Sequence, residues 1–186
     1  GATKLHVEHI LQDLARSGEI SSAVFRYFNA SGAAADGTIG EDHSPESHLI
    51  PLAIFAATGQ RGALKIFGTD YPTPDGTCLR DYIHVVDLAA AHVVALERIF
   101  NDSMAEAFEV FNLGTGEGST VLEVIQSFER ATGASLQWSF APRRAGDVIA
   151  AYADTHRATE VLGWTAQKSL DEAMADAWRW QQSLQG

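Results

Sequence analysis

The side chains best suited to chemistry in this sequence are Arg80 and Tyr82, which flank Asp81 in the run LRDYIH. Alternate side chains of a β-strand share a face, so Arg80 and Tyr82 should point one way and Asp81 the other. A guanidinium and a phenol on a rigid strand suit a planar, multiply charged group such as a phosphate. A surface ion pair on a β-hairpin explains these residues equally well when they are taken alone.

A second basic feature is the adjacent pair Arg143 and Arg144, followed by Asp147. Two neighbouring arginines most often lie on a solvated loop. Together with Arg80, however, they could hold a diphosphate from two sides, because guanidinium groups form paired, charge-assisted hydrogen bonds with phosphate oxygens. We therefore expect Arg80 and this pair to converge on one pyrophosphate, although they belong to separate segments.

The elements that must position these groups alternate between strands and helices. Apolar, β-branched and aromatic runs predict strands at 22–28, 64–67, 80–82, 108–113 and 136–140, the second and third forming a hairpin. Apolar spacing and end signals predict helices near 1–18, 49–58, 87–100, 120–133, 155–162 and from 169 onward. The alternation indicates an α/β fold with a largely parallel sheet.

Side chains at the ends of these elements support the assignment. Thr120 with Glu123, and Ser169 with Glu172, have the spacing of capping boxes at helix starts. Asn29 is expected to end the first strand, at the sheet edge where ligands bind in open α/β folds. Asparagine is also a common turn residue, so a purely structural role explains it as well.

Composition narrows the class of partner. Thirteen basic and twenty-four acidic side chains among 186 residues leave a formal net charge of −11, which argues against nucleic acid or an anionic membrane as partner. No apolar run approaches the length of a membrane span. Cys78 is the only cysteine, so no internal disulfide can form, which is consistent with the cytoplasm. We interpret it as a small strand residue rather than a nucleophile.

Two patterns that invite other functions fail on spacing. The loop Gly114-Thr115-Gly116-Glu117-Gly118 has its third glycine one residue too early for the dinucleotide fingerprint. His6 and His9 share a helix face, but HxEH is not the zinc spacing HExxH. We therefore expect no dinucleotide site at that loop and no metal.

Several motifs, in this order along nearly the whole chain, resemble UDP-glucose 4-epimerases of the extended short-chain dehydrogenase/reductase superfamily. They are GATKLHVE, RYFNASGA, HLIP, IFGTDYPTPDGTCLRDYIHV, FNLGTGEGSTVLEV and APRRAGD. The resemblance implies an incomplete Rossmann-like, NAD-binding half that lacks its N-terminal strands, at 1–31 and 84–113. It also implies a smaller α/β nucleotide-sugar-binding domain at 32–83 and 114–186.

The same resemblance implies roles at the cofactor. Lys4 resembles the lysine of a YxxxK motif, which holds the nicotinamide ribose and lowers the pKa of the catalytic tyrosine. That tyrosine would stand immediately before Gly1, so we expect a chain that is cut inside a helix and is inactive by itself. Tyr27 resembles a residue beside the nicotinamide.

On the substrate side, the resemblance assigns Asn29 to a phosphate, and His48 and Leu49 to the diphosphate and uridine region. Phe67 would pack against the uridine, and Arg80 and Tyr82 would belong to the substrate-binding loop. Arg144 would contact the phosphates and Asp147 a ribose hydroxyl. Ala151 stands where some relatives carry a bulky tyrosine near the hexose, so its smaller wall predicts that N-acetylated sugars are accepted too.

The expected protein is thus the C-terminal portion of an NAD-dependent UDP-glucose/UDP-galactose 4-epimerase, acting on a UDP-hexose or a UDP-N-acetylhexosamine. We expect a cytoplasmic homodimer, because the first helix resembles one that crosses the family's dimer interface. Two alternatives stay open. One is a related nucleotide-sugar dehydratase, decarboxylase or epimerase, and the other is a non-catalytic module that binds a partner or oligomerises.

Overall fold

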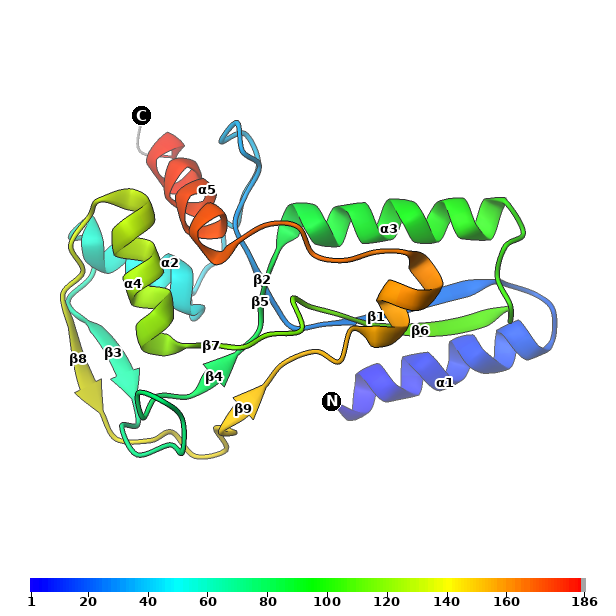
Figure 1. Cartoon of the computed structure of the whole chain (residues 1–186), viewed down its shortest axis with the longest axis horizontal. Helices are drawn as coiled ribbons and strands as arrows, with labels where there is room; N and C mark the ends of the chain where they lie inside the picture. The colour runs from blue at the N-terminus through cyan, green and yellow to red at the C-terminus, as the bar shows by residue number, and fades with distance from the viewer. Residues whose placement is uncertain (185–186) are drawn as a thin grey trace.

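A computed structural model describes residues 1–184, which form two lobes along the longest axis of the molecule (Figure 1). One lobe, called here the α1 lobe, contains α1 (Ala2–Arg16), α3 (Val85–Phe100) and the π-helix η1 (Ala158–Leu162). The other, the α4 lobe, contains α2 (Leu49–Ala57), α4 (Val121–Thr132) and α5 (Leu170–Ser183). None of the helices in the described part is both long and apolar enough to cross a membrane.

Short, mostly parallel strand pairs connect these helices. The parallel pairs are β1 (Ser22–Tyr27) with β6 (Phe108–Leu113), β2 (Asn29–Ser31) with β5 (Tyr82–His84), and β3 (Leu64–Phe67) with β8 (Trp138–Ala141). The strand β4 (Leu79–Arg80) lies between β7 (Ser119–Thr120), which is antiparallel to it, and β9 (Ala150–Ala151), which is parallel. The predicted α/β class with a largely parallel sheet is confirmed.

The predicted hairpin between 64–67 and 80–82 is wrong. The intervening segment closes on itself, because Tyr71 N donates to Gly76 O at 3.0 Å and Thr77 donates to the Asp75 carboxylate at 2.9 and 2.7 Å. Thr120 also donates to Asp75, which ties this turn to the start of α4. The chain therefore enters a different sheet after the turn, and β3 pairs with β8 instead.

Two expectations about the first strand also need correction. The strand predicted at 22–28 ends at Tyr27, and it is only partly covered, with β6 as its single neighbour among the described strands. Asn29 does not end this strand; it begins β2 after a break at Phe28. The break turns the chain from the α1 lobe toward the α4 lobe (Figure 1).

Helix starts follow their local sequence closely. Both predicted capping boxes are present, at Thr120 with Glu123 and at Ser169 with Glu172. The helix expected from residue 87 begins earlier, at Val85, because the His84 side chain accepts a hydrogen bond from Val86 N at 3.1 Å and caps it.

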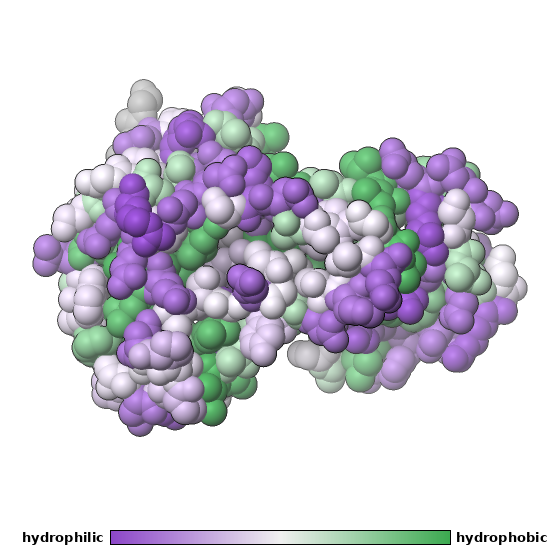
Figure 2. Space-filling model, in the orientation of Figure 1, coloured by the Kyte–Doolittle hydropathy of each residue, from purple (hydrophilic) through white to green (hydrophobic). Residues whose placement is uncertain are grey.

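Each lobe has its own hydrophobic core. In the α4 lobe the fully buried Ile54, Ile66, Phe128 and Met174 join α2, β3, α4 and α5. In the α1 lobe Ile83, Phe111 and Leu113 pack below α3 and η1. Each such side chain contributes about 1.5–3 kcal/mol relative to exposure. Polar residues cover much of the visible face of both lobes, and apolar groups lie between them, one of them over α3 (Figure 2).

Candidate functional site

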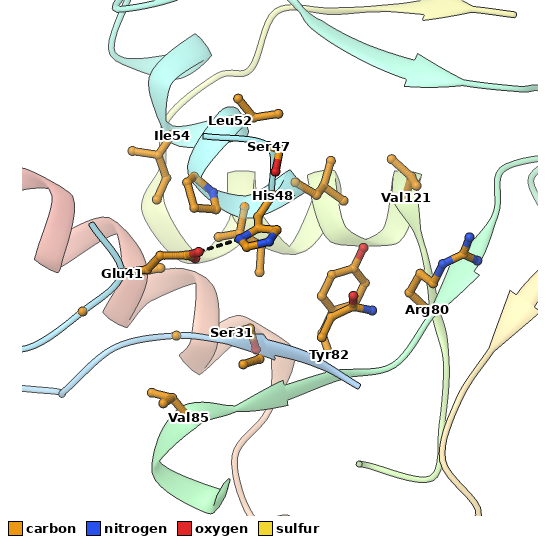
Figure 3. A pocket seen from close by; sticks show the side chains of 18 of the residues that line it. Ser31, Glu41, Ser47, His48, Leu52, Ile54, Arg80, Tyr82, Val85 and Val121 are labelled. Carbon is orange, nitrogen blue, oxygen red and sulfur yellow. Dashed lines mark hydrogen bonds and ion pairs between the residues drawn. The ribbon is translucent and has the colours of Figure 1, made fainter. Parts of the chain in front are cut away.

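A cavity of about 840 Å³ lies where β2, α2, β3 and the β4–β5 segment meet the loop that follows β8. Figure 3 shows part of its lining from close by. Eight of the residues predicted for the substrate lie along this cavity, namely Asn29, His48, Leu49, Phe67, Arg80, Tyr82, Arg144 and Asp147. The structure therefore brings together residues from five separate stretches of sequence.

Arg80 and Arg144 meet at one carboxylate, that of Asp147. Arg144 Nε donates to Asp147 Oδ2 at 3.0 Å, and Arg80 Nη2 lies 3.8 Å from Asp147 Oδ1. The Arg80 and Asp147 side chains are largely covered, whereas that of Arg144 is 56% exposed. Two guanidinium groups that share one anionic partner can both reach a single diphosphate in its place, since such groups bind carboxylate and phosphate oxygens alike.

The two adjacent arginines have different surroundings. The Arg144 guanidinium lies 4.7 Å from the centroid of the Phe67 ring, inside the cavity lining. Arg143 instead pairs with Asp70 at 2.6 Å and lies 3.9 Å from the centroid of the Tyr71 ring, outside that lining. Of this pair, only Arg144 is placed to bind a ligand in the cavity.

Asp81 holds Arg80 and Tyr82 in place from behind. It is fully buried, and its carboxylate accepts hydrogen bonds from Thr115 N at 2.9 Å, Thr115 Oγ1 at 2.8 Å and Ala153 N at 3.1 Å. Its two neighbours line the cavity on the other side of the strand, as the predicted alternation requires. These hydrogen bonds offset the cost of burying the Asp81 charge, and they fix the loops that donate them.

The glycine-rich loop at 114–118 serves this packing. A Cβ on Gly114 would overlap the Asp81 carboxylate, and a Cβ on Gly118 would overlap the Leu79 side chain. The amides of Thr115 and Gly116 donate to Asp81, so they hold a carboxylate of the protein itself. These two amides are therefore occupied by a side chain of the chain itself.

Tyr82 and Asn29 add neutral polar groups. Burial raises the pKa of the Tyr82 phenol above its usual value, so the group stays protonated and can donate a hydrogen bond. Asn29 Nδ2 donates to the backbone oxygen of Asp81 at 3.1 Å, which fixes the orientation of the amide. The cavity therefore offers two arginines, one phenol and one oriented amide within a mainly apolar wall.

His48 lies at the start of α2 and at the rim of the cavity. Its Nδ1 lies 2.5 Å from Glu41 Oε1, an interaction drawn in Figure 3. Leu49 is the first residue of α2 and also lines the cavity. The His48 ring is therefore engaged by a carboxylate rather than directed at the arginines.

Three predicted residues lie outside the cavity lining. Lys4 is exposed on α1, one turn before Glu8, which pairs with Arg26 of β1. Tyr27 is 54% exposed at the end of β1. Ala151 is partly exposed in β9, where it is the register partner of Arg80.

These positions bear on a cofactor. Lys4 and Tyr27 are accessible and could contact the nicotinamide end of NAD. The phosphates of a dinucleotide need a loop with free backbone amides. The glycine-rich loop of the described residues has committed its amides to Asp81. The amides of Thr115 and Gly116 are therefore not free to hold the phosphates of NAD.

Many residues of the cavity lining were not singled out in the sequence, among them Phe28, Lys65 and Trp180. Lys65 shares a strand face with Phe67 by simple alternation, so the pattern LKIF carried a signal for it. Phe28 lies between Tyr27 and Asn29, which were both predicted site residues, so its position in the sequence carried a signal. Trp180 comes from the last helix, and no local pattern connects it to this cavity.

The chain belongs to the NAD dependent epimerase/dehydratase family, whose sequence pattern matches residues 1–114. Within it, the chain is similar to UDP-glucose 4-epimerases. The enzyme of that name from Bacillus subtilis (strain 168) is 48% identical over 185 residues, which make up 98% of this chain and 54% of that protein. The chain therefore spans about half the length of such relatives.

Solved structures show the same relation. The crystal structure of UDP-glucose-4-epimerase from Stenotrophomonas maltophila, with bound NAD and formylated UDP-arabinopyranose, is 44% identical with a TM-score of 0.93. The match covers 99% of this chain and 55% of that one. The UDP-Glc/GlcNAc 4-epimerase from Campylobacter jejuni is 36% identical with a TM-score of 0.80, covering 98% of this chain and 55% of that one.

Proposed function

We propose that this chain is the C-terminal half of an NAD-dependent UDP-glucose/UDP-galactose 4-epimerase and supplies its UDP-binding site. The observation that carries the proposal is the meeting of Arg80 and Arg144 at Asp147 inside a cavity large enough for a nucleotide sugar. Similarity to UDP-glucose 4-epimerases over nearly the whole chain supports it. In this proposal 1–31 and 84–113 belong to the NAD-binding domain, and 32–83 and 114–186 to the nucleotide-sugar domain.

The residues of the chain would act by holding the substrate. Arg80 and Arg144 would bind the two phosphates, Phe67 would pack against the uracil ring, and Asp147 would turn from the arginines to a ribose hydroxyl. Inversion at C4 requires the hexose to turn over while the UDP stays fixed. A site whose charged contacts are concentrated on the diphosphate meets this requirement.

The remaining roles concern the cofactor and the sugar. NAD, when bound, would supply the redox chemistry at C4 of the hexose. Lys4 and Tyr27 would contact its nicotinamide end, and the neutral phenol of Tyr82, with Asn29, would orient the substrate by hydrogen bonds. His48 and Leu49 would border the diphosphate and uridine region from the start of α2.

The test is an assay of two proteins side by side. The full-length protein that contains this chain is expected to interconvert UDP-glucose and UDP-galactose, whereas the chain alone is expected to be inactive. A full-length protein that dehydrates or decarboxylates a nucleotide sugar without epimerising UDP-glucose would overturn the proposal in favour of a related enzyme. A full-length protein that binds no nucleotide sugar would indicate a non-catalytic module.

The proposed sugar range includes UDP-N-acetylhexosamines, because Ala151 adds little bulk beside Arg80. A full-length Ala151→Tyr variant is expected to lose turnover of UDP-GlcNAc at least tenfold while it keeps turnover of UDP-glucose. Steady-state kinetics on both substrates measure this. Equal effects on both substrates, or no turnover of UDP-GlcNAc by the unsubstituted enzyme, would contradict the proposed role of Ala151.

We also propose a cytoplasmic homodimer that associates through α1. Leu5, Val7 and Ile10 of that helix are each about half exposed, and such side chains commonly pack against a partner. Light scattering of the full-length protein should give twice the mass of one chain. A Leu5→Asp, Ile10→Asp double variant should give the mass of one chain.

A further inference from the structure

Four metal-binding side chains gather on the loop at 41–48, which leads into α2. They are Glu41, His43, Glu46 and His48, and one donor atom from each lies within 4.8 Å of all the others. His48 Nδ1 lies 2.5 Å from Glu41 Oε1, and Glu46 Oε1 lies 3.6 Å from His48 Nδ1 and 3.7 Å from His43 Nδ1. Two imidazoles and two carboxylates thus converge on one small volume.

The donor set and its spacing suit one class of metal ion. Zn²⁺ takes imidazole nitrogens and carboxylate oxygens in tetrahedral sites at about 2.0–2.2 Å, which places neighbouring donors about 3.4 Å apart. The contacts of 3.6 and 3.7 Å are near this separation, and the one of 2.5 Å would open slightly. Imidazole ligands favour Zn²⁺ over Mg²⁺ or Ca²⁺, which prefer oxygen.

The charge of this loop is negative, which favours binding of a cation. Residues 36–48 contain four acidic side chains and neither Lys nor Arg. Across residues 1–184, the ion pairs of Glu41 and Glu46 are made with histidines alone. The two carboxylates would give the site two negative charges, which a divalent ion would balance.

The loop is also held in place before any ion binds. The Glu41 backbone oxygen accepts hydrogen bonds from Trp180 Nε1 at 2.8 Å and Gln181 Nε2 at 3.2 Å, which tie the loop to α5. The rings of His43 and His48 are stacked, with centroids 5.3 Å apart. Because the backbone is fixed and the rings already face the carboxylates, binding needs only small side-chain adjustments.

We propose that the 41–48 loop binds one divalent transition-metal ion, with Zn²⁺ the best match, through Glu41, His43, Glu46 and His48. Glu41 and His48 line the cavity, so the ion would stiffen its wall beside α2. His48 would then act through the position of that wall and not by contact with a diphosphate. The ligand spacing E-x-H-x-x-E-x-H differs from the zinc motif HExxH, and the expectation of no metal considered only His6 and His9.

The experiment uses the full-length protein after removal of bound metal with a chelator. Calorimetry with ZnCl₂ is expected to show one equivalent bound per chain, and CoCl₂ is expected to give the visible absorption bands of a tetrahedral site. His43→Ala should weaken Zn²⁺ binding at least tenfold. His43 is exposed and lies outside the cavity lining, so this variant should fold normally, as circular dichroism will check.

The matched control is His156→Ala. His156 is exposed and pairs with Glu160 at 3.3 Å, so it has the same chemistry without two further ligands. It should leave Zn²⁺ affinity and the cobalt bands unchanged. The proposal is overturned if the unsubstituted protein binds less than half an equivalent, if the cobalt spectrum is octahedral, or if both variants bind alike. Because the readout is metal binding, the result does not depend on epimerase activity.

Discussion

Phe67 illustrates how a single side chain connects the site to the ligand it is proposed to bind. Its ring lines the cavity, and the Arg144 guanidinium lies 4.7 Å from its centroid. A contact of this kind contributes about 0.5–2 kcal/mol, and stacking of a base on an aromatic ring about 1–3 kcal/mol. Both contacts would be made in the ground state and the transition state alike.

Replacing Phe67 should therefore affect binding more than turnover. In the full-length enzyme, Phe67→Ala is expected to raise KM for UDP-glucose about tenfold with kcat nearly unchanged. The reason is that the lost contacts stabilise the bound ground state and the transition state equally. Phe140→Ala is the matched control, since Phe140 is half exposed on β8 and lies outside the cavity lining. A fall in kcat with KM unchanged would place Phe67 at the sugar instead.

At the scale of the element, the glycine-rich loop acts as a spacer between β6 and β7. Gly118→Ala should lower the free energy of unfolding by about 1–3 kcal/mol, because its Cβ would overlap the Leu79 side chain next to Arg80. Gly62→Ala is the control: no atom lies within 4 Å of the Cβ that it would add. Urea denaturation of the two variants measures the difference. Equal free energies of unfolding for the two variants would show that the loop shifts to accept the added methyl group.

Elements were predictable where the signal was local. Capping boxes depend on residues three positions apart, so Thr120 and Ser169 marked their helix starts correctly. Strand pairing depends on distant segments, and nothing within 64–84 indicated that β3 would pair with β8. The convergence of Arg80 and Arg144 was expected, but Arg144 was singled out by the family resemblance, since nothing in the adjacent pair itself tells which arginine faces the cavity. The neighbours Asp70 and Tyr71 decide that.

At the scale of the whole molecule, resistance to acid should depend on buried ion pairs. Glu109 is almost fully buried and pairs with Arg98 through two hydrogen bonds, at 2.9 and 3.0 Å. The Arg98 guanidinium holds the pKa of Glu109 below its usual value. A carboxyl with a depressed pKa stabilises the fold above its unfolded-state pKa of about 4.3 and loses that contribution as pH falls through its folded-state pKa.

Glu109→Gln is accordingly expected to destabilise the protein by about 3 kcal/mol at pH 7, because it leaves Arg98 without its counter-charge. The difference from the unsubstituted protein should shrink as pH falls below about 4. Urea denaturation across this range measures both values. A Glu117→Gln variant serves as control, because no ion pair of Glu117 is present among residues 1–184. A constant difference at all pH values would contradict the assigned role of the pair.

The central claim is that two arginines from separate segments hold one diphosphate. Calorimetric titration of the full-length protein with UDP tests it most directly, with Arg144→Ala, Arg80→Ala and Arg143→Ala compared. Loss of a charge-assisted contact costs about 1.5–3 kcal/mol, so the first two variants should bind UDP about 10–100 times more weakly, and Arg143→Ala should bind it normally. Uridine, which lacks the phosphates, should bind all four proteins with similar affinity. Unchanged UDP affinity in Arg80→Ala and Arg144→Ala would contradict the account.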